Sequence, residues 1–315
     1  MKLIVQIPCF NEEATLATTV AEIPRDLPGV DVVEVLIVDD GSSDRTMAVA
    51  REAGVNHIVT HRANFGLAQA FATGLDASLK LGADLIVNTD ADNQYQGADI
   101  ESLVAPLLAG EADIVIGDRQ TDTIQEFSWL KRQLQNWGSA LVRKLSGTDV
   151  RDAVSGFRAY TREAALQINV VSKFSYTIET VIQTGNKALA VKSVPIGVNP
   201  KTRDSRLFRS IPHFLFRQGT TIFRMYGMYR PLRLFAAAGT LFLLVGLGAI
   251  ARFLYFVLMG EGDGHVQSVV LGGTLVLLGA ITLLMGLLAD LVGHNRRLLE
   301  LTLEKVRRLE LRGEP

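Results

Sequence analysis

Two long apolar stretches near the C-terminus constrain this chain more than any other feature of its sequence. Residues 266–289 contain no charged side chain, and residues 234–259 contain only Arg252. As helices that rise 1.5 Å per residue they would extend about 36 and 39 Å, enough to cross a hydrocarbon core of about 30 Å. Nothing in the rest of the chain is large enough to enclose two such helices, so we expect a transmembrane hairpin.

The charges around the two stretches predict their orientation. Residues 217–233 contain four arginines and residues 296–312 contain six Lys and Arg, whereas the connecting loop 260–265 contains two acidic residues and no Lys or Arg. Because Lys and Arg gather on the cytoplasmic side of a membrane, we expect both ends of the hairpin in the cytoplasm and the loop outside.

Glycines recur every seven residues within both apolar stretches. Small residues at this spacing form one face of a helix and let two helix backbones approach closely. The sequence therefore predicts that the two spans pack against each other along Gly239, Gly246, Gly272, Gly279 and Gly286.

The net charge of −1 hides a division of the chain. Residues 1–200 hold 17 Lys and Arg against 25 Asp and Glu, whereas residues 201–315 hold 15 against 8. An acidic body joined to a basic segment argues against a nucleic-acid binder and indicates a domain held at an anionic membrane surface. Most of that basic charge lies in 201–233, and residues 208–234 mix arginines with apolar residues, which predicts interfacial helices. The single cysteine, Cys9, excludes a disulfide within the chain and a cysteine-based zinc site.

Residues 1–120 alternate between short β-branched apolar runs and stretches compatible with helices. We expect strands at 3–7, 32–38, 57–60, 84–88 and 113–116, and helices at 13–23, 44–54, 66–80 and 99–109. This alternation predicts an α/β fold with a doubly wound, mostly parallel sheet. Such sheets bind ligands at the carboxyl ends of their strands, where the strand order reverses.

The sharpest chemical signal follows the fourth expected strand, at Asp90-Ala91-Asp92. Two carboxylates at a strand end supply the hard oxygen ligands that Mg²⁺ or Mn²⁺ prefers, and a diphosphate would complete the shell. A D-x-D pattern alone is common in loops, but Asp39 and Asp40 end a neighbouring strand and strengthen the interpretation. The alternative for that second pair is a turn before Gly41. The motifs of dinucleotide dehydrogenases, P-loop ATPases and α/β-hydrolases are absent.

Five segments in this order carry a resemblance to a known family: IPCFNEEATL, VLIVDDGSSDRT, NTDADNQY, IGDR and DAVSGFRAY. They resemble glycosyltransferase family 2 on a GT-A fold. With the two C-terminal stretches, the chain is similar to the polyprenyl-phosphate glycosyltransferases, over about residues 1–300. The resemblance implies a membrane-anchored, inverting hexosyltransferase. It would use Mg²⁺ or Mn²⁺ and move one sugar from a UDP- or GDP-linked nucleotide sugar to a polyprenyl phosphate.

The same resemblance implies roles for individual residues. Those for nucleotide-sugar binding are Pro8, Phe10, Glu12, Asp40, Asp90, Ala91, Gln94, Arg203, Ser205 and Arg206, with Asp90 and Asp92 as the metal ligands. Those for catalysis are Asp92, Arg119 and Asp152, and those for the lipid phosphate are Arg119 and either Lys131 or Arg132.

Two questions stay open at this point. The carboxylate of Asp152 could act as a general base or could orient the acceptor or an arginine. Because a phosphate monoester has its second pKa at about 6 and is largely dianionic at neutral pH, we favour the orienting role. The basic residues at 201–209 could bind the diphosphate or only the membrane surface.

Other functional classes fit the sequence less well. The segment 133–137, QLQNW, lacks the arginine of the Q-x-x-R-W motif of processive polysaccharide synthases, and two spans are too few for a polymer channel. An inactive lipid-binding scaffold would be expected to have lost its acidic cluster, and this chain retains it.

The expected organisation has four parts. These are a GT-A domain over 1–205, amphipathic juxtamembrane helices over 206–233, a two-helix hairpin over 234–292 and a cytoplasmic helix over 293–315. In the last part Leu299, Leu303 and Val306 are spaced as in a short coiled coil, which would make a homo-oligomer, although we favour a helix that is solvated or lies on a surface.

Overall fold

The computed structural model describes residues 1–120, 140, 142–143, 146–171, 176–200, 219–220, 223–224, 226–260 and 262–313. The chain forms two compact units, one of residues 1–222 with 304–315, and one of residues 223–303. The strands are β1 (Lys2–Cys9), β2 (Val32–Asp39), β3 (His57–Thr60), β4 (Leu85–Asn88), β5 (Ile114–Asp118), β6 (Arg158–Thr161) and β7 (Val191–Pro195). The helices are α1 (Leu16–Ala21), α2 (Thr46–Glu52), α3 (Leu67–Lys80), α4 (Ile100–Leu108), α6 (Arg162–Gln167), α7 (Thr177–Asn186), α9 (Pro231–Leu258) and α10 (Val266–Gly313), with short 3₁₀ turns η1 (Gly97–Asp99) and η2 (Gly262–His265).

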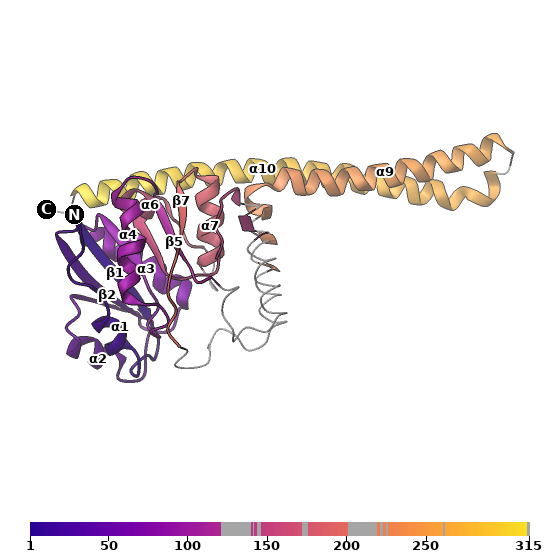
Figure 1. The fold of residues 1–315 in the computed structure, drawn as a ribbon. Coiled ribbons are helices and arrows are strands. Elements are labelled where there is room, and N and C mark those ends of the chain that lie inside the picture. The colour runs from indigo at the N-terminus through magenta and orange to yellow at the C-terminus, as the bar shows by residue number, and fades with distance from the viewer. Residues whose placement is uncertain are drawn as a thin grey trace. The chain divides into compact units, whose positions relative to one another are not determined.

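The first unit is built on a seven-stranded mixed sheet with strand order β3-β2-β1-β4-β6-β5-β7 (Figure 1). All neighbouring pairs are parallel except those that β6 makes with β4 and β5. The carboxyl ends of the other six strands therefore meet at one edge, where β6 begins. The order reverses at β1, because the chain continues to β2 on one side and returns to β4 on the other, so a ligand site is expected beside the end of β1.

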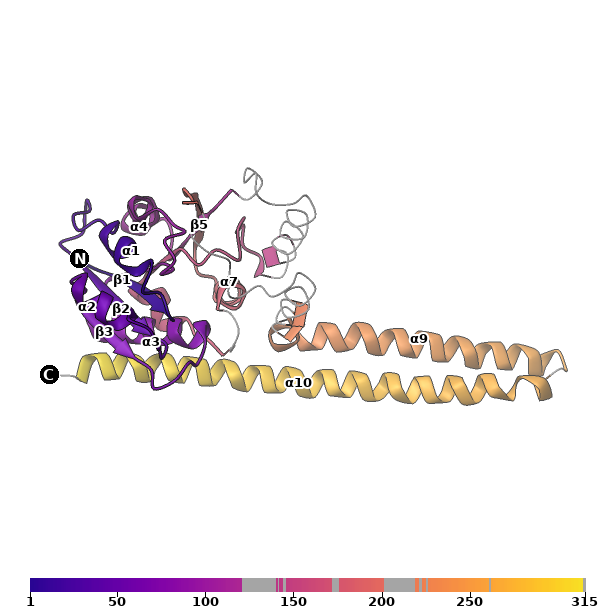
Figure 2. The same cartoon turned by 90° about the horizontal axis from the view of Figure 1, so that it is seen from below.

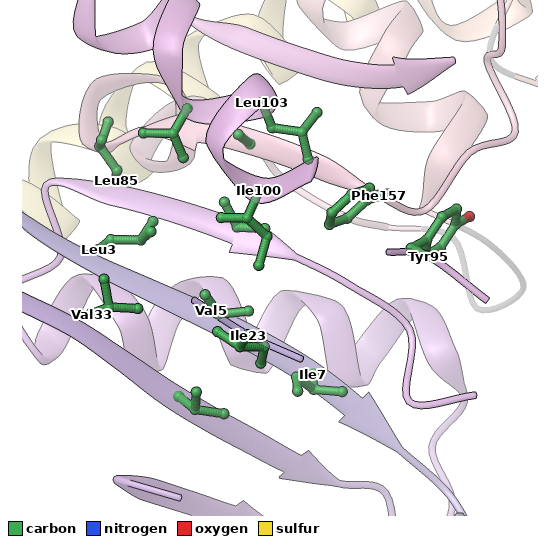
Figure 3. Close-up of a cluster of buried hydrophobic side chains, with 14 of the residues drawn as sticks. Leu3, Val5, Ile7, Ile23, Val33, Leu85, Tyr95, Ile100, Leu103 and Phe157 are labelled. Atoms are coloured by element: carbon green, nitrogen blue, oxygen red, sulfur yellow. The ribbon is translucent and has the colours of Figure 1, made fainter. Parts of the chain in front are cut away.

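The strands β1, β2, β4 and β5 are largely buried on both faces, which explains their nearly continuous apolar runs. Leu3, Val5 and Ile7 of β1 face a cluster that also holds Ile100 and Leu103 of α4 (Figure 3). The intervening residues of β1 point to the opposite face, which α3 covers. Full burial of one such aliphatic side chain stabilises the fold by about 1.5–3 kcal/mol.

The second unit contains two antiparallel helices, α9 and the membrane-length part of α10, which run side by side (Figures 1 and 2). Both are long and apolar enough to cross a membrane, and only 6% and 11% of their most apolar windows are buried. A helix that is apolar all round and unburied is suited to lipid rather than to water. The predicted pair of membrane-length helices is thus present.

Glycines let the two helices touch, as the sequence predicts. A Cβ atom on Gly246 would lie 2.8 Å from the carbonyl oxygen of Gly272, and one on Gly279 would lie 2.9 Å from that of Gly239. A Cβ on Gly286 would lie 2.7 Å from Cβ of Phe235. The seven-residue spacing therefore marks the contact face of each helix.

The last residues of α10 belong to the first unit. Arg308 donates from Nη1 to Oε1 of Glu163 at 3.1 Å, and Arg307 donates from Nη1 to the carbonyl oxygens of Leu166 and Ile168, both at 3.2 Å. The end of α10 is therefore held against α6 by arginine side chains.

Candidate active site

The loops after β1 and β2 are tied together by hydrogen bonds. The N–H of Asn11 donates to Oγ of Ser42 at 2.9 Å, and the N–H of Ser43 donates to Oδ1 of Asn11 at 2.8 Å. The N–H of Glu12 donates to Oγ1 of Thr46 at 2.8 Å. Asn11 has a φ of 55°, a left-handed conformation that asparagine tolerates better than most residues. The two loops therefore form one polar surface at the carboxyl edge of the sheet.

Three residues expected to bind base and ribose lie on the first of these loops or at its start. Pro8 is buried within β1, and Phe10 is partly exposed just after the strand. Glu12 is 8% exposed, and its Oε2 accepts a hydrogen bond from Thr15. The structure thus places all three at the edge where the strand order reverses.

Asp40 organises the loop after β3. Its Oδ1 accepts a hydrogen bond from the N–H of Phe65 at 2.9 Å and lies 2.7 Å from Nδ1 of His61, while Oδ2 accepts from the N–H of Gly66 at 2.8 Å. The other ring nitrogen of His61 lies 3.0 Å from Oγ1 of Thr73. The Asp40 carboxylate thus holds the loop 61–66, up to the residue before α3, by direct hydrogen bonds.

Gly41 is required by the close approach of two loops. Its φ is +76°, and a Cβ atom there would lie 2.7 Å from the carbonyl carbon of Ala63. A side chain at this position would push the loop after β2 away from the loop after β3.

The Asp90-Ala91-Asp92 segment lies directly after β4. The carbonyl oxygen of Ala91 accepts hydrogen bonds from the hydroxyls of Thr15 at 2.8 Å and Thr19 at 3.2 Å. Oδ1 of Asp92 accepts from the N–H of Gln94 at 3.2 Å. The backbone between the two carboxylates is therefore anchored to α1 and the turn before it.

The carboxylate of Asp90 lies against the backbone of Gly156, where a Cβ atom would be 3.0 Å from Oδ2 and 3.1 Å from Oδ1. Burial first, and the neighbouring Asp92 carboxylate second, raise the pKa of Asp90 to about 7. Two acidic groups crowded in this way are stabilised as carboxylates by a nearby cation.

The donor set at Asp90 and Asp92 fits a divalent cation that is shared with a diphosphate. Among the residues that the structure describes, no three His, Cys, Asp or Glu side chains gather into a metal site made of protein alone. Mg²⁺ and related ions are commonly held by one or two carboxylates together with phosphate oxygens. The two aspartates match that second arrangement.

Arg119 and Asp152 form a two-point ion pair across from the acidic segment. Nε of Arg119 donates to Oδ2 of Asp152 at 2.7 Å, and Nη2 donates to Oδ1 at 3.1 Å. Burial alone would raise the pKa of the Asp152 carboxyl, but the charge and hydrogen bonds of Arg119 outweigh it and hold that pKa below its usual value. The Asp152 carboxylate also raises the pKa of Arg119 against the effect of burial. Both groups are therefore fully ionised at neutral pH.

Five of the expected site residues lie outside the described part of the chain. These are Lys131 and Arg132, expected at the lipid phosphate, and Arg203, Ser205 and Arg206, expected over the diphosphate.

The sequence profile of the family described as Glycosyl transferase family 2 matches residues 4–168. This range includes the loops after β1 and β2, the Asp90-Ala91-Asp92 segment and the Arg119–Asp152 pair. The chain belongs to glycosyltransferase family 2. The expected family is thereby confirmed, and the mixed sheet matches the expected GT-A fold.

Relatives in this family include polyprenol monophosphomannose synthase from Mycolicibacterium smegmatis, which is 31% identical over 206 residues, 62% of this chain and 76% of the relative. Dodecaprenyl-phosphate galacturonate synthase from Rhizobium johnstonii is 25% identical over 315 residues, 94% of this chain and 88% of the relative. The solved structure of glucosyl-3-phosphoglycerate synthase from Mycobacterium tuberculosis has a TM-score of 0.53 at 22% identity, covering 72% of this chain and 78% of that one. At that identity the structural likeness concerns the fold.

The family 2 domain also contains polar residues at the site that sequence reasoning did not single out. The N–H of Gly156 donates to the hydroxyl of Tyr95 at 3.0 Å, and its carbonyl oxygen accepts from Nδ2 of Asn88 at 2.9 Å. The same Nδ2 donates to the hydroxyl of Tyr176 at 2.9 Å. Asn88 and Tyr95 lie in the NTDADNQY segment and Gly156 lies in the DAVSGFRAY segment. Their membership in these motifs is the sequence feature that could have identified them.

Proposed function

We propose that this protein is a membrane-anchored glycosyltransferase that moves one sugar from a nucleotide sugar to a polyprenyl phosphate, with inversion at the anomeric carbon. The observation that carries the proposal is that one chain joins a family 2 domain to two membrane-length helices. The galacturonate synthase, whose name specifies a dodecaprenyl-phosphate-linked sugar, aligns with 94% of this chain, a share too large to leave out either helix entirely.

The donor would bind at the carboxyl edge beside β1. Pro8, Phe10 and Glu12 lie where base and ribose would contact the end of β1, and Asp40 acts through the loop 61–66. Gln94 and Ala91 would line the diphosphate side. This position of the donor is supported by the reversal of strand order at β1, because α/β sheets bind nucleotides at such a point.

Asp90 and Asp92 would hold a divalent cation, magnesium or manganese. When bound, such an ion neutralises charge that develops on the diphosphate leaving group. The hydroxyls of Thr15 and Thr19 bind the carbonyl oxygen of Ala91, between the two aspartates. The two carboxylates would therefore present their oxygens to the cation from a fixed backbone. One solved structure of glucosyl-3-phosphoglycerate synthase, at 25% identity and a TM-score of 0.51, contains Mn²⁺ and UDP-glucose, which supports this choice of ligands.

Arg119 would stabilise negative charge on the reacting phosphates, and Asp152 would keep its guanidinium in place. A carboxylate that already accepts two hydrogen bonds from an arginine, and whose pKa lies below its usual value, is a weak proton acceptor. The acceptor needs little proton removal, because a phosphate monoester with a second pKa of about 6 is mostly dianionic at neutral pH. The lipid phosphate oxygen would attack the anomeric carbon in line, and the nucleoside diphosphate would leave.

Lys131 or Arg132 would bind the lipid phosphate, and Arg203, Ser205 and Arg206 would close over the diphosphate. These assignments come from the family resemblance alone. We further propose that the catalytic domain and both chain ends lie in the cytoplasm. Lys and Arg precede the first apolar stretch and follow the second, whereas the loop between the two stretches has none.

The test is a donor panel with the full-length protein in nanodiscs that contain undecaprenyl phosphate. UDP-glucose, UDP-N-acetylglucosamine, UDP-galacturonate and GDP-mannose are each supplied with Mn²⁺ or Mg²⁺, and lipid products are followed by mass spectrometry. We expect at least one donor to give a lipid with one added sugar in the presence of metal and none in excess EDTA. Failure of all four donors with both metals, for protein that binds nucleotide, would contradict the proposal.

A further inference from the structure

The side chain of Arg158 is buried at the carboxyl edge of the sheet. Arg158 is the first residue of β6, where it pairs with Asn88 of β4 on one side and Ile116 of β5 on the other. The residue is only 1% exposed. It therefore lies beneath the loop that carries Asp152, among residues that the proposed reaction does not use directly.

All the hydrogen-bond partners that the structure describes for Arg158 are neutral oxygens. Nε donates to the carbonyl oxygen of Ser155 at 2.7 Å, and Nη2 donates to that of Ala153 at 2.9 Å. Nη1 donates to the carbonyl oxygen of Thr177 at 3.0 Å and to Oγ1 of Thr180 at 2.6 Å. One guanidinium thus joins the loop 152–156 to the first turn of α7.

A buried cation without a carboxylate in hydrogen-bond contact is costly, since its hydration is lost. The Asp90 carboxylate acts on Arg158 through space, and the guanidinium lies 5.8 Å from the centroid of the Tyr176 ring, but neither replaces a direct ion pair. An apolar side chain could fill the same volume at lower cost. The arrangement is therefore unusual for a residue that only fills the core, and its four directed hydrogen bonds indicate control of backbone position.

The loop that Arg158 holds is the one that positions the ion pair at the site. The N–H of Val154 donates to Oδ1 of Asp152 at 3.3 Å, and Oδ1 also accepts from Arg119. At the far end of the loop, the Gly156 peptide is fixed by Tyr95 and Asn88. A shift of the carbonyl groups at 153 and 155 would move Asp152 and, through it, the guanidinium of Arg119.

We propose that Arg158 is a positioning residue that holds the loop 152–156 in the shape in which Asp152 binds Arg119. Its planar fork supplies donors in fixed directions to two loop carbonyls and to α7 together, which a lysine ammonium on a flexible stem does not reproduce.

The first arm of the test measures hydrogen exchange in the full-length protein in detergent and does not depend on the proposed function. Arg158→Gln is expected to speed exchange in peptides that cover residues 150–157 by at least about tenfold and to leave β1 protected, because local opening is governed by local contacts. Thr180→Val removes one acceptor of Arg158 and keeps its charge, so it should give a smaller increase in the same peptides. This second variant decides the matter if Arg158→Gln does not fold.

Arg162→Gln is the matched control. Arg162 is also an arginine beside β6, and it donates to the carbonyl oxygen of Ala83 at 3.0 Å, away from the loop. We expect this variant to leave exchange at 150–157 unchanged. Unchanged loop exchange in the Thr180→Val variant, or an equal increase in the Arg162→Gln variant, would overturn the proposal.

The second arm measures transfer and rests on the proposed function. With the donor that the panel identifies, Arg158→Gln and Arg158→Lys should lower kcat by about 100-fold, the loss that an ångström-scale misplacement can cause. The KM for the nucleotide sugar and the Kd for Mn²⁺-UDP should change little, because the donor contacts lie on other loops. Parallel loss of donor binding and kcat, or full activity of Arg158→Lys, would contradict a positioning role. If the wild-type protein transfers no sugar, the proposed function fails, and the exchange arm still decides the role of Arg158.

Discussion

The carboxylate of Asp152 accepts two hydrogen bonds from the guanidinium of Arg119, from Nε at 2.7 Å and from Nη2 at 3.1 Å. Charge-assisted pairs of this two-point geometry fix direction as well as distance. Asp152 is also nearly inaccessible, at 3% exposed. A group held in this way suits the orientation of an arginine better than the removal of a proton.

Replacement of Asp152 by Asn should therefore lower the plateau of the pH–rate profile without moving its midpoint. Because Arg119 holds the pKa of Asp152 below its usual value, this carboxyl is ionised throughout the range from pH 6 to 9 and its titration does not shape the rate there. The rate should instead rise through pH ~6 with ionisation of the acceptor phosphate and then level off.

The profile is measured for wild-type and Asp152→Asn proteins with saturating lipid phosphate and Mn²⁺. We expect the variant plateau to fall by about ten- to 100-fold through lost orientation of Arg119. A variant with no activity at any pH, yet with normal binding of both substrates, would show that Asp152 is an obligate base.

Replacement of Asp92 by Ala should abolish transfer and metal-dependent binding of nucleotide while the fold is retained. The reason is that Asp92 is one of only two carboxylates in the D-x-D segment, and loss of one leaves too few protein ligands for the cation. Isothermal titration with UDP or GDP and Mn²⁺ measures binding, and circular dichroism measures folding. Asp76→Ala is the control, because Asp76 lies partly exposed on α3 and its only ion pair among the described residues is with Lys80. Metal-stimulated turnover in Asp92→Ala protein would contradict the metal assignment.

Replacement of Asp40 by Asn should weaken both the fold and donor binding. The amide nitrogen would face a donor at one of the positions where the carboxylate now accepts from His61, Phe65 and Gly66. A buried hydrogen bond to a charged group is worth about 1.5–3 kcal/mol, so the midpoint of thermal unfolding should fall by several degrees. Nucleotide titration should show a higher Kd. An unchanged melting midpoint would mean that Asp40 does not hold the loop 61–66.

Adjacent glycines of α10 provide a matched test of the hairpin. A Cβ atom on Gly272 would lie 2.7 Å from the carbonyl oxygen of Gly246, whereas one on Gly273 would meet nothing within 4 Å. Gly272→Ala should destabilise the hairpin by about 1–3 kcal/mol through overpacking. Gly273→Ala should be neutral or stabilising, since alanine favours a helix over glycine by about 0.8–1.0 kcal/mol. Thermal unfolding in nanodiscs distinguishes the two, and equal effects would contradict close helix packing.

The strands β1, β2, β4 and β5 could be predicted from the sequence because each is a local apolar run that is largely buried. The parallel strand β7, with the sequence VKSVP, was not predicted, because it is mostly part-exposed and is not a continuous apolar run. β2 is one residue longer than the expected strand at 32–38, and β3 has the bounds of the expected strand at 57–60. The glycine contacts of the hairpin were predictable for a similar reason, since a spacing of seven marks one helix face whatever the partner helix is.

β6 was not predicted, because nothing local distinguishes it. It has four residues, begins with an arginine and inserts antiparallel between β4 and β5, strands that are distant from it in the chain. The residues that hold the loop around Asp152 were not predicted for the same reason. The contacts of Arg158 with Thr177 and of Asn88 with Gly156 join residues that only the folded sheet brings together.

The most direct test of the central claim compares acceptors with the full-length protein and its preferred nucleotide sugar. Undecaprenyl phosphate, undecaprenol and soluble 3-phosphoglycerate are supplied separately, and each product is identified by mass and by the NMR coupling constant of its anomeric proton. We predict that only undecaprenyl phosphate is glycosylated, that it gains one sugar, and that the anomeric configuration is inverted relative to the donor. A sugar polymer, a retained configuration, or faster transfer to the soluble acceptor would contradict the account.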